Sequence, residues 1–293
     1  MSLLIFKLYK PGVGQDHCSI KQRSNHMAGS SPNSSIIELS ASEGVADIRL
    51  NRPEVLNAFS DDSVRALVSA LRQVDRRPDL NVAVLSGNGR SFSSGADVRQ
   101  RQLRSREELI ALGGPEGDGA KCADIFTQSV NWKPVVAAVH GYAIGMGLGV
   151  ALSCDLIVAE DGTQFQVTET LRGLSSVRYM EMLKMRGSGS FAIDVTLTGR
   201  WFSAQEALAA GVIDRVVAQG SAYQEAHRIA RQIADHPPLG IRASVRSRRM
   251  ALDAAERRAA AQTDALKLHL TEDFSESARA FVEKRQHVPY KGQ

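Results

Sequence analysis

The sequence predicts an α/β protein, and two kinds of segment support this fold class. Three short apolar runs, at residues 82–85, 135–139 and 156–159, lack the polar alternation of a half-exposed strand. Such continuous runs are typical of strands that are covered on both faces. Segments with apolar residues at helical spacing alternate with these runs along the chain. The order of strand, turn and helix therefore predicts stacked α/β units, and a helical region follows them.

The first predicted elements are a hairpin, a helix and a buried strand. Residues 35–40 and 45–50 are expected to form strands around a turn at residues 42–44. Ser60 is expected to cap the next helix, because two aspartates follow it in the first turn. The helix has apolar residues at helical spacing: Val64, Leu67, Val68, Leu71 and Val74. The strand at residues 82–85 follows and ends at a Gly-Asn-Gly turn.

The middle of the chain repeats this order. A helix predicted at residues 121–130 leads through Pro134 into the strand at 135–139. A glycine-rich turn then opens a short predicted helix at residues 148–152, ahead of the strand at 156–159. From about residue 220 onward Ala, Arg and Glu dominate, which favours helices. Three are expected, at residues 222–235, 239–265 and 273–286.

Three parts are predicted along the chain. Residues 1–34 form a polar extension that we expect to be disordered, with a transit peptide or a start at Met27 as alternatives. Residues 35–219 are the predicted core, and residues 220–293 are the predicted helical C-terminal region. The apolar stripes of these C-terminal helices must be buried against the core or against a neighbouring subunit.

Composition and charge exclude several classes of protein. The chain has 293 residues, of which 43% are hydrophobic and 23% charged, as in ordinary globular proteins, and no apolar run is long enough to span a membrane. Residues 1–33 carry +3 of the net charge of +4, so the rest is nearly neutral and matches nucleic acid poorly. The scattered Cys18, Cys122 and Cys154 argue against disulfides and zinc fingers and predict a reducing, cytoplasmic location.

The first candidate site is the segment Ser-Phe-Ser-Ser-Gly-Ala-Asp at residues 91–97, directly after a predicted buried strand. Small residues allow a ligand to approach the backbone closely. A turn into a helix also leaves N–H groups without internal acceptors, and these can bind an anion or a developing oxyanion. A surface loop capped by Asp97 is the alternative.

The second candidate site is the glycine-rich segment at residues 140–149, which again follows a buried strand and opens a helix. Its glycines, Gly145, Gly147 and Gly149, do not have the spacing of a dinucleotide-binding loop. The chain also has no Gly-Lys-Ser/Thr, which excludes a P-loop. Close packing of a helix on a strand is the alternative.

The third candidate site is Glu169, at the end of the segment 165–169. A carboxylate at the end of an apolar strand can be partly desolvated, which raises its pKa toward that of a useful general base. An exposed or capping glutamate is the alternative.

In this order and at these separations, the three segments resemble the crotonase family of enoyl-CoA hydratases and isomerases. The resemblance covers roughly residues 36–290. Further motifs contribute to it: Leu50-Asn51-Arg52-Pro53, Leu56-Asn57-Ala58, Pro134 to Gly141, Cys154-Asp155-Leu156 and Leu197-Thr198-Gly199-Arg200. It implies a spiral of ββα units with a C-terminal helical region that forms a homotrimer or a dimer of trimers.

The resemblance also implies an acyl-CoA substrate. By position, the backbone N–H groups of Ala96 and Met146 would hold the thioester oxygen and stabilise an enolate. The residues implied to bind substrate are Gly95, Ala96, Asp97, Val98, Gly145 and Met146. Coenzyme A would enter as part of the substrate. No permanent cofactor, metal, nucleic acid or membrane partner is implied.

The departures from the family pattern bear on the reaction. Family hydratases use two glutamates, but the first of these positions is Gly149 here, while Glu169 is retained. A single carboxylate favours an isomerase that moves one proton between two carbons. A hydratase, and a non-catalytic acyl-CoA-binding or RNA-binding protein, are the alternatives. Met146 replaces a common glycine, and Val177 stands where dienoyl isomerase-like and dehalogenase-like members carry Asp.

His140 and the basic run at residues 242–249 are both expected to be structural. A serine hydrolase is disfavoured because the chain has no Gly-x-Ser-x-Gly, and His140 is interpreted as a hydrogen-bonded core or pocket histidine. The basic run at residues 242–249 is expected to be the solvated face of a helix, with contact to coenzyme A phosphates as the alternative.

Overall fold

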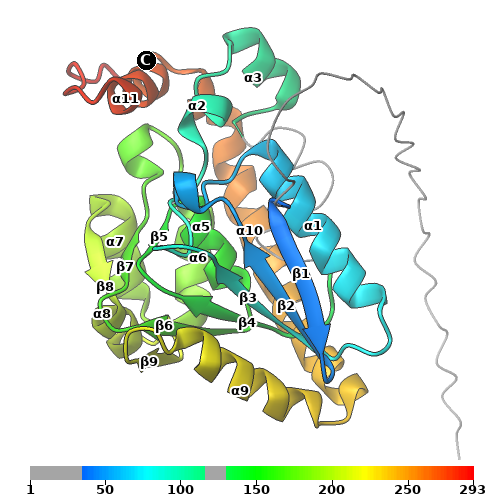
Figure 1. Cartoon of the computed structure of the whole chain (residues 1–293). Helices are drawn as coiled ribbons and strands as arrows, with labels where there is room; N and C mark the ends of the chain where they lie inside the picture. Colours follow the sequence, from blue (N-terminus) through cyan, green and yellow to red (C-terminus); the bar gives the residue numbers. More distant parts are fainter. Residues whose placement is uncertain (1–34, 116–129) are drawn as a thin grey trace, which may run out of the picture. The chain divides into compact units, whose positions relative to one another are not determined.

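The computed structural model describes residues 35–115 and 130–293, and a six-stranded sheet organises them (Figure 1). Its first two strands pair antiparallel, and all the other pairs are parallel. In spatial order the strands are β1 (Ile37–Ser42), β2 (Val45–Leu50), β3 (Val82–Gly87), β4 (Val135–Val139), β6 (Leu156–Glu160) and β9 (Arg215–Val217). A small second sheet contains β5 (Tyr142–Ile144), β7 (Gln164–Gln166) and β8 (Trp201–Ser203). The predicted α/β fold class is confirmed.

The hairpin of β1 and β2 turns on two residues rather than on the three predicted. Glu43 and Gly44 have φ angles of 49° and 81°, and Ser42 pairs with Val45. Two consecutive positive φ angles match the right-handed twist of the flanking strands. The first strand therefore extends to residue 42, beyond the predicted end at residue 40.

The strands β3 and β4 are buried on both faces, as predicted. On β3, Ala83 and Leu85 belong to one apolar cluster, whereas Val82 and Val84 belong to another. The second cluster is completed by α9 (Ala222–Ala234), which lies along that face of the sheet (Figure 1). The first contains the apolar face of α1 (Asp61–Arg76), whose N-cap Ser60 accepts a hydrogen bond from Ser63 N–H as expected.

The other predicted helices in the described part of the chain are also present: α5 (Met146–Ser153), α10 (Pro238–Thr263) and α11 (Glu272–Glu283). The further helices are α2 (Val98–Arg101), α3 (Arg106–Leu112), α6 (Val177–Arg186), α7 (Gly189–Thr198) and α8 (Ala204–Ala209). Four short 3-10 helices are η1 (Pro53–Val55), η2 (Thr170–Arg172), η3 (Asp264–Leu266) and η4 (Leu268–Leu270). None of the described helices is long and apolar enough to cross a membrane.

Some predictions fall outside the described residues. These are the extension at residues 1–34, Cys18, Cys122 and all but the last residue of the helix predicted at 121–130. Residues 34–293 form one compact unit. Within it the C-terminal helices pack on the rest, α9 on the sheet and α10 on α6.

The basic run at residues 242–249 is not simply a solvated face, because its last two arginines point inward from α10. Arg248 donates to the carbonyl oxygens of Leu152, Ser153 and Cys154, at the C-terminal end of α5. Arg249 is only 1% exposed and pairs with Asp155 at 2.5 Å. Cations at the negative end of a helix are stabilising, so these arginines hold α5 in place.

Arg249→Met is expected to lower the free energy of unfolding by about 3–5 kcal/mol. It removes a buried ion pair with Asp155, whose remaining ion-pair partner among the described residues is Arg248 at 3.2 Å, and it takes the donor from the carbonyls of Asn131 and Lys133. Denaturant unfolding measures this change. Arg246→Met on the same helix is the matched control: its guanidinium lies 5.1 Å from the Trp132 ring and is exposed, so it should cost no more than about 1 kcal/mol. Equal losses in both variants would contradict the buried-pair account.

Candidate active site

The turn at residues 94–97 is held by main-chain hydrogen bonds to Phe59. The Phe59 N–H donates to the Gly95 carbonyl at 2.7 Å, and the Asp97 N–H donates to the Phe59 carbonyl at 2.9 Å. Ala96 lies between these two bonded residues, and its own N–H has no acceptor among the described residues. The predicted donor is thus positioned by its neighbours and left available.

The other side of this segment pairs with β5. Ser93 N–H donates to the Tyr142 carbonyl, and Ile144 N–H donates to the Ser93 carbonyl, at 3.0 and 3.1 Å. The Ser93 hydroxyl donates to the Asn57 carbonyl and accepts from the Gly95 N–H. Sequence reasoning missed Ser93, whose hydrogen bonds connect the turn to both neighbouring segments.

The N-terminus of α5 lies directly against this turn. Gly95 has a φ of +97°, and a Cβ added to it would lie 2.7 Å from the Ile144 carbonyl oxygen and 3.6 Å from the Met146 nitrogen. Met146 is the first residue of α5, where an N–H has no acceptor within the helix. The turn that carries Ala96 and the N–H of Met146 are therefore neighbours.

Glu169 also lies against this helix end. Its Oε2 accepts a hydrogen bond from the Thr168 N–H at 2.9 Å. Its Oε1 faces Gly145, the N-cap of α5, where an added Cβ would lie 3.2 Å from that oxygen. The structure thus brings together Gly95, Gly145, Met146 and Glu169, which the sequence had placed in three separate segments.

The side chains of Asp97 and Met146 are engaged within the protein. Asp97 accepts from the Gln100 N–H as the N-cap of α2 and pairs with Arg52 at 3.6 Å. Met146 is 8% exposed, and its sulfur accepts a hydrogen bond from Arg101 at 3.2 Å. The main chain of Asp97 is engaged as well, because its N–H donates to Phe59 and its carbonyl accepts from the Arg101 N–H at 2.8 Å. The predicted role of Asp97 in substrate binding therefore stays a prediction, as does that of the half-buried Val98 beside it.

Gly149 lies one helical turn beyond Gly145, to whose carbonyl its N–H donates at 2.9 Å. Side chains on a helix point back toward its N-terminus, so a side chain at this position would extend toward Gly145 and Glu169. A glycine places no carboxylate there.

His140 is hydrogen bonded as interpreted from the sequence. Its Nε2 lies 2.9 Å from the Gly89 carbonyl oxygen, which can only accept, so Nε2 carries the proton. The ring lies at the edge of a cavity beside α9 rather than at Glu169.

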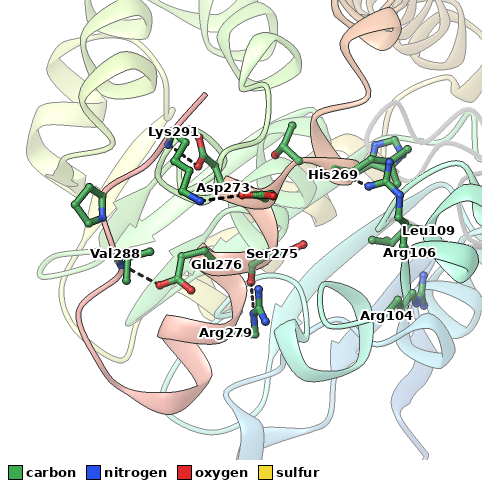
Figure 2. A pocket seen from close by; sticks show the side chains of 14 residues that line it. Arg104, Arg106, Leu109, His269, Asp273, Ser275, Glu276, Arg279, Val288 and Lys291 are labelled. Atoms are coloured by element: carbon green, nitrogen blue, oxygen red, sulfur yellow. Dashed lines mark hydrogen bonds and ion pairs between the residues drawn. The ribbon is translucent and has the colours of Figure 1, made fainter. Parts of the chain in front are cut away.

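A cavity of about 380 Å³ lies between α3 and the C-terminal segment (Figure 2). Its charged side chains mainly hold that segment in place. Asp273 accepts from the N–H groups of Lys291 and Gly292, and Glu276 accepts from that of Val288. Arg106 donates to the Leu270 carbonyl at 2.6 Å. None of the residues predicted for the active site lines this cavity.

Comparison with known proteins shows the family of the chain. The model of the family described as enoyl-CoA hydratase/isomerase matches residues 40–293. An (E)-benzylidenesuccinyl-CoA hydratase of Thauera aromatica is 32% identical over 253 residues, covering 85% of this chain and 96% of its own. An enoyl-CoA hydratase, mitochondrial, of Pongo abelii is 32% identical over 246 residues, covering 82% of this chain and 81% of its own.

Solved structures show the same fold. A carnitinyl-CoA hydratase from Mycobacterium avium has a TM-score of 0.75 and 27% identity, covering 89% of this chain and 100% of its own. An enoyl-CoA hydratase subunit from Geobacillus kaustophilus has a TM-score of 0.67 and 31% identity, covering 88% of this chain and 99% of its own.

Proposed function

Because the chain belongs to the enoyl-CoA hydratase/isomerase family, we propose that it converts an acyl-CoA thioester through an enolate, with Glu169 as its acid–base group. The observation that carries this proposal is the placement of Glu169 beside the N-terminus of α5, next to the turn that holds Ala96. The coenzyme A moiety enters with the substrate, and the proposal needs no resident cofactor or metal.

In the proposed mechanism, the N–H groups of Ala96 and Met146 donate to the thioester oxygen. Glu169 removes a proton from the α-carbon of a 3-enoyl thioester, and the electron pair of that bond moves onto the oxygen as an enolate. Preorganised donors stabilise this developing charge. Glu169 then returns the same proton to the γ-carbon as the double bond moves, which gives the 2-enoyl thioester and restores the carboxylate.

The absence of a carboxylate at Gly149 favours this isomerisation over hydration. Hydration needs a water to be oriented and protons to be moved at two places, and Glu169 is the only carboxylate that we assign to the site. A hydratase is the second candidate, because several of the most similar relatives are named as hydratases.

Turnover of 2-enoyl-CoA and 3-enoyl-CoA thioesters of several chain lengths separates the two candidates. Isomerisation of 3-enoyl thioesters with little hydration of 2-enoyl thioesters is the expected result. Hydration without isomerisation would overturn the isomerase proposal, and no turnover of either class would favour a binding protein.

Gly149→Glu is expected to raise hydration of 2-enoyl-CoA above the background of the unchanged protein. A glutamate there would extend toward Glu169, so that one carboxylate can orient a water while the other handles the α-proton. The substitution suits a helix, since Glu is a better helix former than Gly. Gly149→Gln is the matched control, with a similar shape and no carboxylate. A folded Gly149→Glu protein that binds coenzyme A without any gain in hydration would contradict this explanation.

We further propose a homotrimer or a dimer of trimers. Exposed apolar surfaces often mark interfaces between subunits. Such side chains lie on and around α7: Tyr142, Leu171, Ile193, Leu197 and Trp201. Sedimentation equilibrium should give three or six chains per particle, and a monomer would refute this part of the proposal. A cytoplasmic location stays a prediction from the cysteines.

A further inference from the structure

A second cavity, of about 520 Å³, lies at the carboxyl ends of the parallel strands, between the sheet and the start of α9. We call it the α9 cavity. Arg49 on β2, Ser86 on β3 and Glu160 on β6 line it. These three side chains lie on the same face of the sheet as Val45, Val84 and Val158, which pack against α9. Met146 belongs to the apolar cluster on the opposite face, so the α9 cavity is separate from the proposed active site. Ligands of open parallel sheets bind at this edge.

The α9 cavity is lined by two arginines without a carboxylate partner. Neither Arg49 nor Arg90 forms an ion pair with any residue that the structure describes. The Arg49 guanidinium lies 4.8 Å from the centre of the Tyr223 ring, and the Tyr223 hydroxyl donates to Asp47 at 2.8 Å. Arg49 is therefore supported by an anchored aromatic ring, and no ion pair with the described residues competes with an anion for its guanidinium.

A largely buried serine also lines this cavity. Ser86 is only 7% exposed, and its hydroxyl forms no hydrogen bond within residues 35–115 and 130–293. The hydroxyl is accessible from the cavity, so it can donate a hydrogen bond to a ligand that enters there.

The N-terminus of α9 contributes further donors. Ala222 and Tyr223, in its first turn, line the cavity, and the side chain of the N-cap residue Ser221 accepts no capping hydrogen bond. The first N–H groups of a helix lack internal acceptors and carry a partial positive charge, which favours anions. This helix end meets the two arginines and Ser86 in one cavity.

We propose that the α9 cavity binds a small phosphate ester other than the acyl-CoA substrate. The phosphate would be held by Arg49, Arg90, the Ser86 hydroxyl and the first turn of α9. Donors from several elements suit a tetrahedral anion with three free oxygens better than a planar carboxylate. The volume exceeds that of phosphate alone and lies within the range of small-molecule sites. Glu160 can accept hydrogen bonds from hydroxyl groups on the rest of such a ligand.

Calorimetric titration of the full-length protein with ribose 5-phosphate tests this proposal. Ribose and inorganic phosphate serve as probes of the two halves of the ligand. Ribose 5-phosphate is expected to bind at one site per chain, more tightly than inorganic phosphate, while ribose alone should not bind measurably. Arg49→Met should weaken binding by at least about tenfold, since it removes a charge-assisted contact to phosphate. Ser86→Val should weaken it as well, with little change in shape.

Arg65→Met is the control for a general loss of positive charge. Arg65 is exposed on α1, pairs with Asp62 and does not line the cavity, so binding should be unchanged. Binding should also persist in protein saturated with coenzyme A, which keeps the result independent of the proposed function. The proposal is overturned if ribose 5-phosphate does not bind, if coenzyme A displaces it, or if Arg65→Met weakens it as much as Arg49→Met and Ser86→Val do.

Discussion

Glu169→Gln is expected to lower kcat by about 10²–10⁴-fold, the range of a lost general base. The change keeps the shape of the side chain, and the amide oxygen can still accept the hydrogen bond that the Thr168 N–H makes to Oε2 at 2.9 Å. Binding of a non-reactive acyl-CoA should persist, because the proposed oxyanion donors are backbone groups. Steady-state turnover and calorimetric titration measure the two properties separately.

The control for this variant is Glu181→Gln, which makes the same chemical change on α6, where Glu181 pairs with Lys184. It should retain the turnover of the unchanged protein. A Glu169→Gln protein with full turnover would show that Glu169 has a structural role, and the proposed mechanism would fail.

Gly95→Ala is expected to lower kcat by about 10²–10³-fold, the effect of losing an oxyanion donor. The new methyl group would lie 2.7 Å from the Ile144 carbonyl oxygen, on a residue with a φ of +97°. The turn must therefore move away from β5, which separates Ala96 from the Met146 N–H. The measurement is turnover of the preferred enoyl-CoA thioester, together with denaturant unfolding to follow the stability.

Gly162→Ala separates backbone strain from this collision. Gly162 has a similar φ of +88°, but a Cβ added there would have no described atom within 4 Å. Both variants should lose about 1 kcal/mol of stability or more, and only Gly95→Ala should lose most of its turnover. A Gly95→Ala protein that is as active as Gly162→Ala would count against the oxyanion hole placed here.

Elements with strong local patterns could be predicted from the sequence. The apolar residues of α1 recur at helical spacing and follow a capping serine, so both its face and its start were correct. The continuous apolar runs of β3 and β4 correctly indicated strands covered on two faces. The strands β5 and β7 have three residues each, which is too few for a periodicity to be recognised.

The individual residues of the candidate site could be predicted from the sequence, but their arrangement in space could not. Glycines at 95 and 145 indicated close approach, and the resemblance supplied roles for Ala96, Met146 and Glu169. Nothing local to the segment at 91–97 indicates that Phe59 and Ile144 hold it from two sides, because those contacts span long sequence separations. The inward arginines Arg248 and Arg249 were missed for a related reason: a basic run on a helix has the same composition whether it faces solvent or helix ends.

The two inward arginines of α10, Arg248 and Arg249, form a clamp on α5 that bears on the order of events during biosynthesis. Arg248 follows Ser153, whose carbonyl it binds, by 95 residues. At elongation rates of about 5–20 residues per second, the clamp is synthesised roughly 5–20 seconds after the helix that it holds. During that interval the growing chain already contains Ala96, Met146 and Glu169, yet the carboxyl end of α5 still lacks the arginines that secure it. Maturation of the proposed active site thus depends on one of the last helices to leave the ribosome. A chain that stops before residue 248 would contain these three residues without the support that the complete fold gives them.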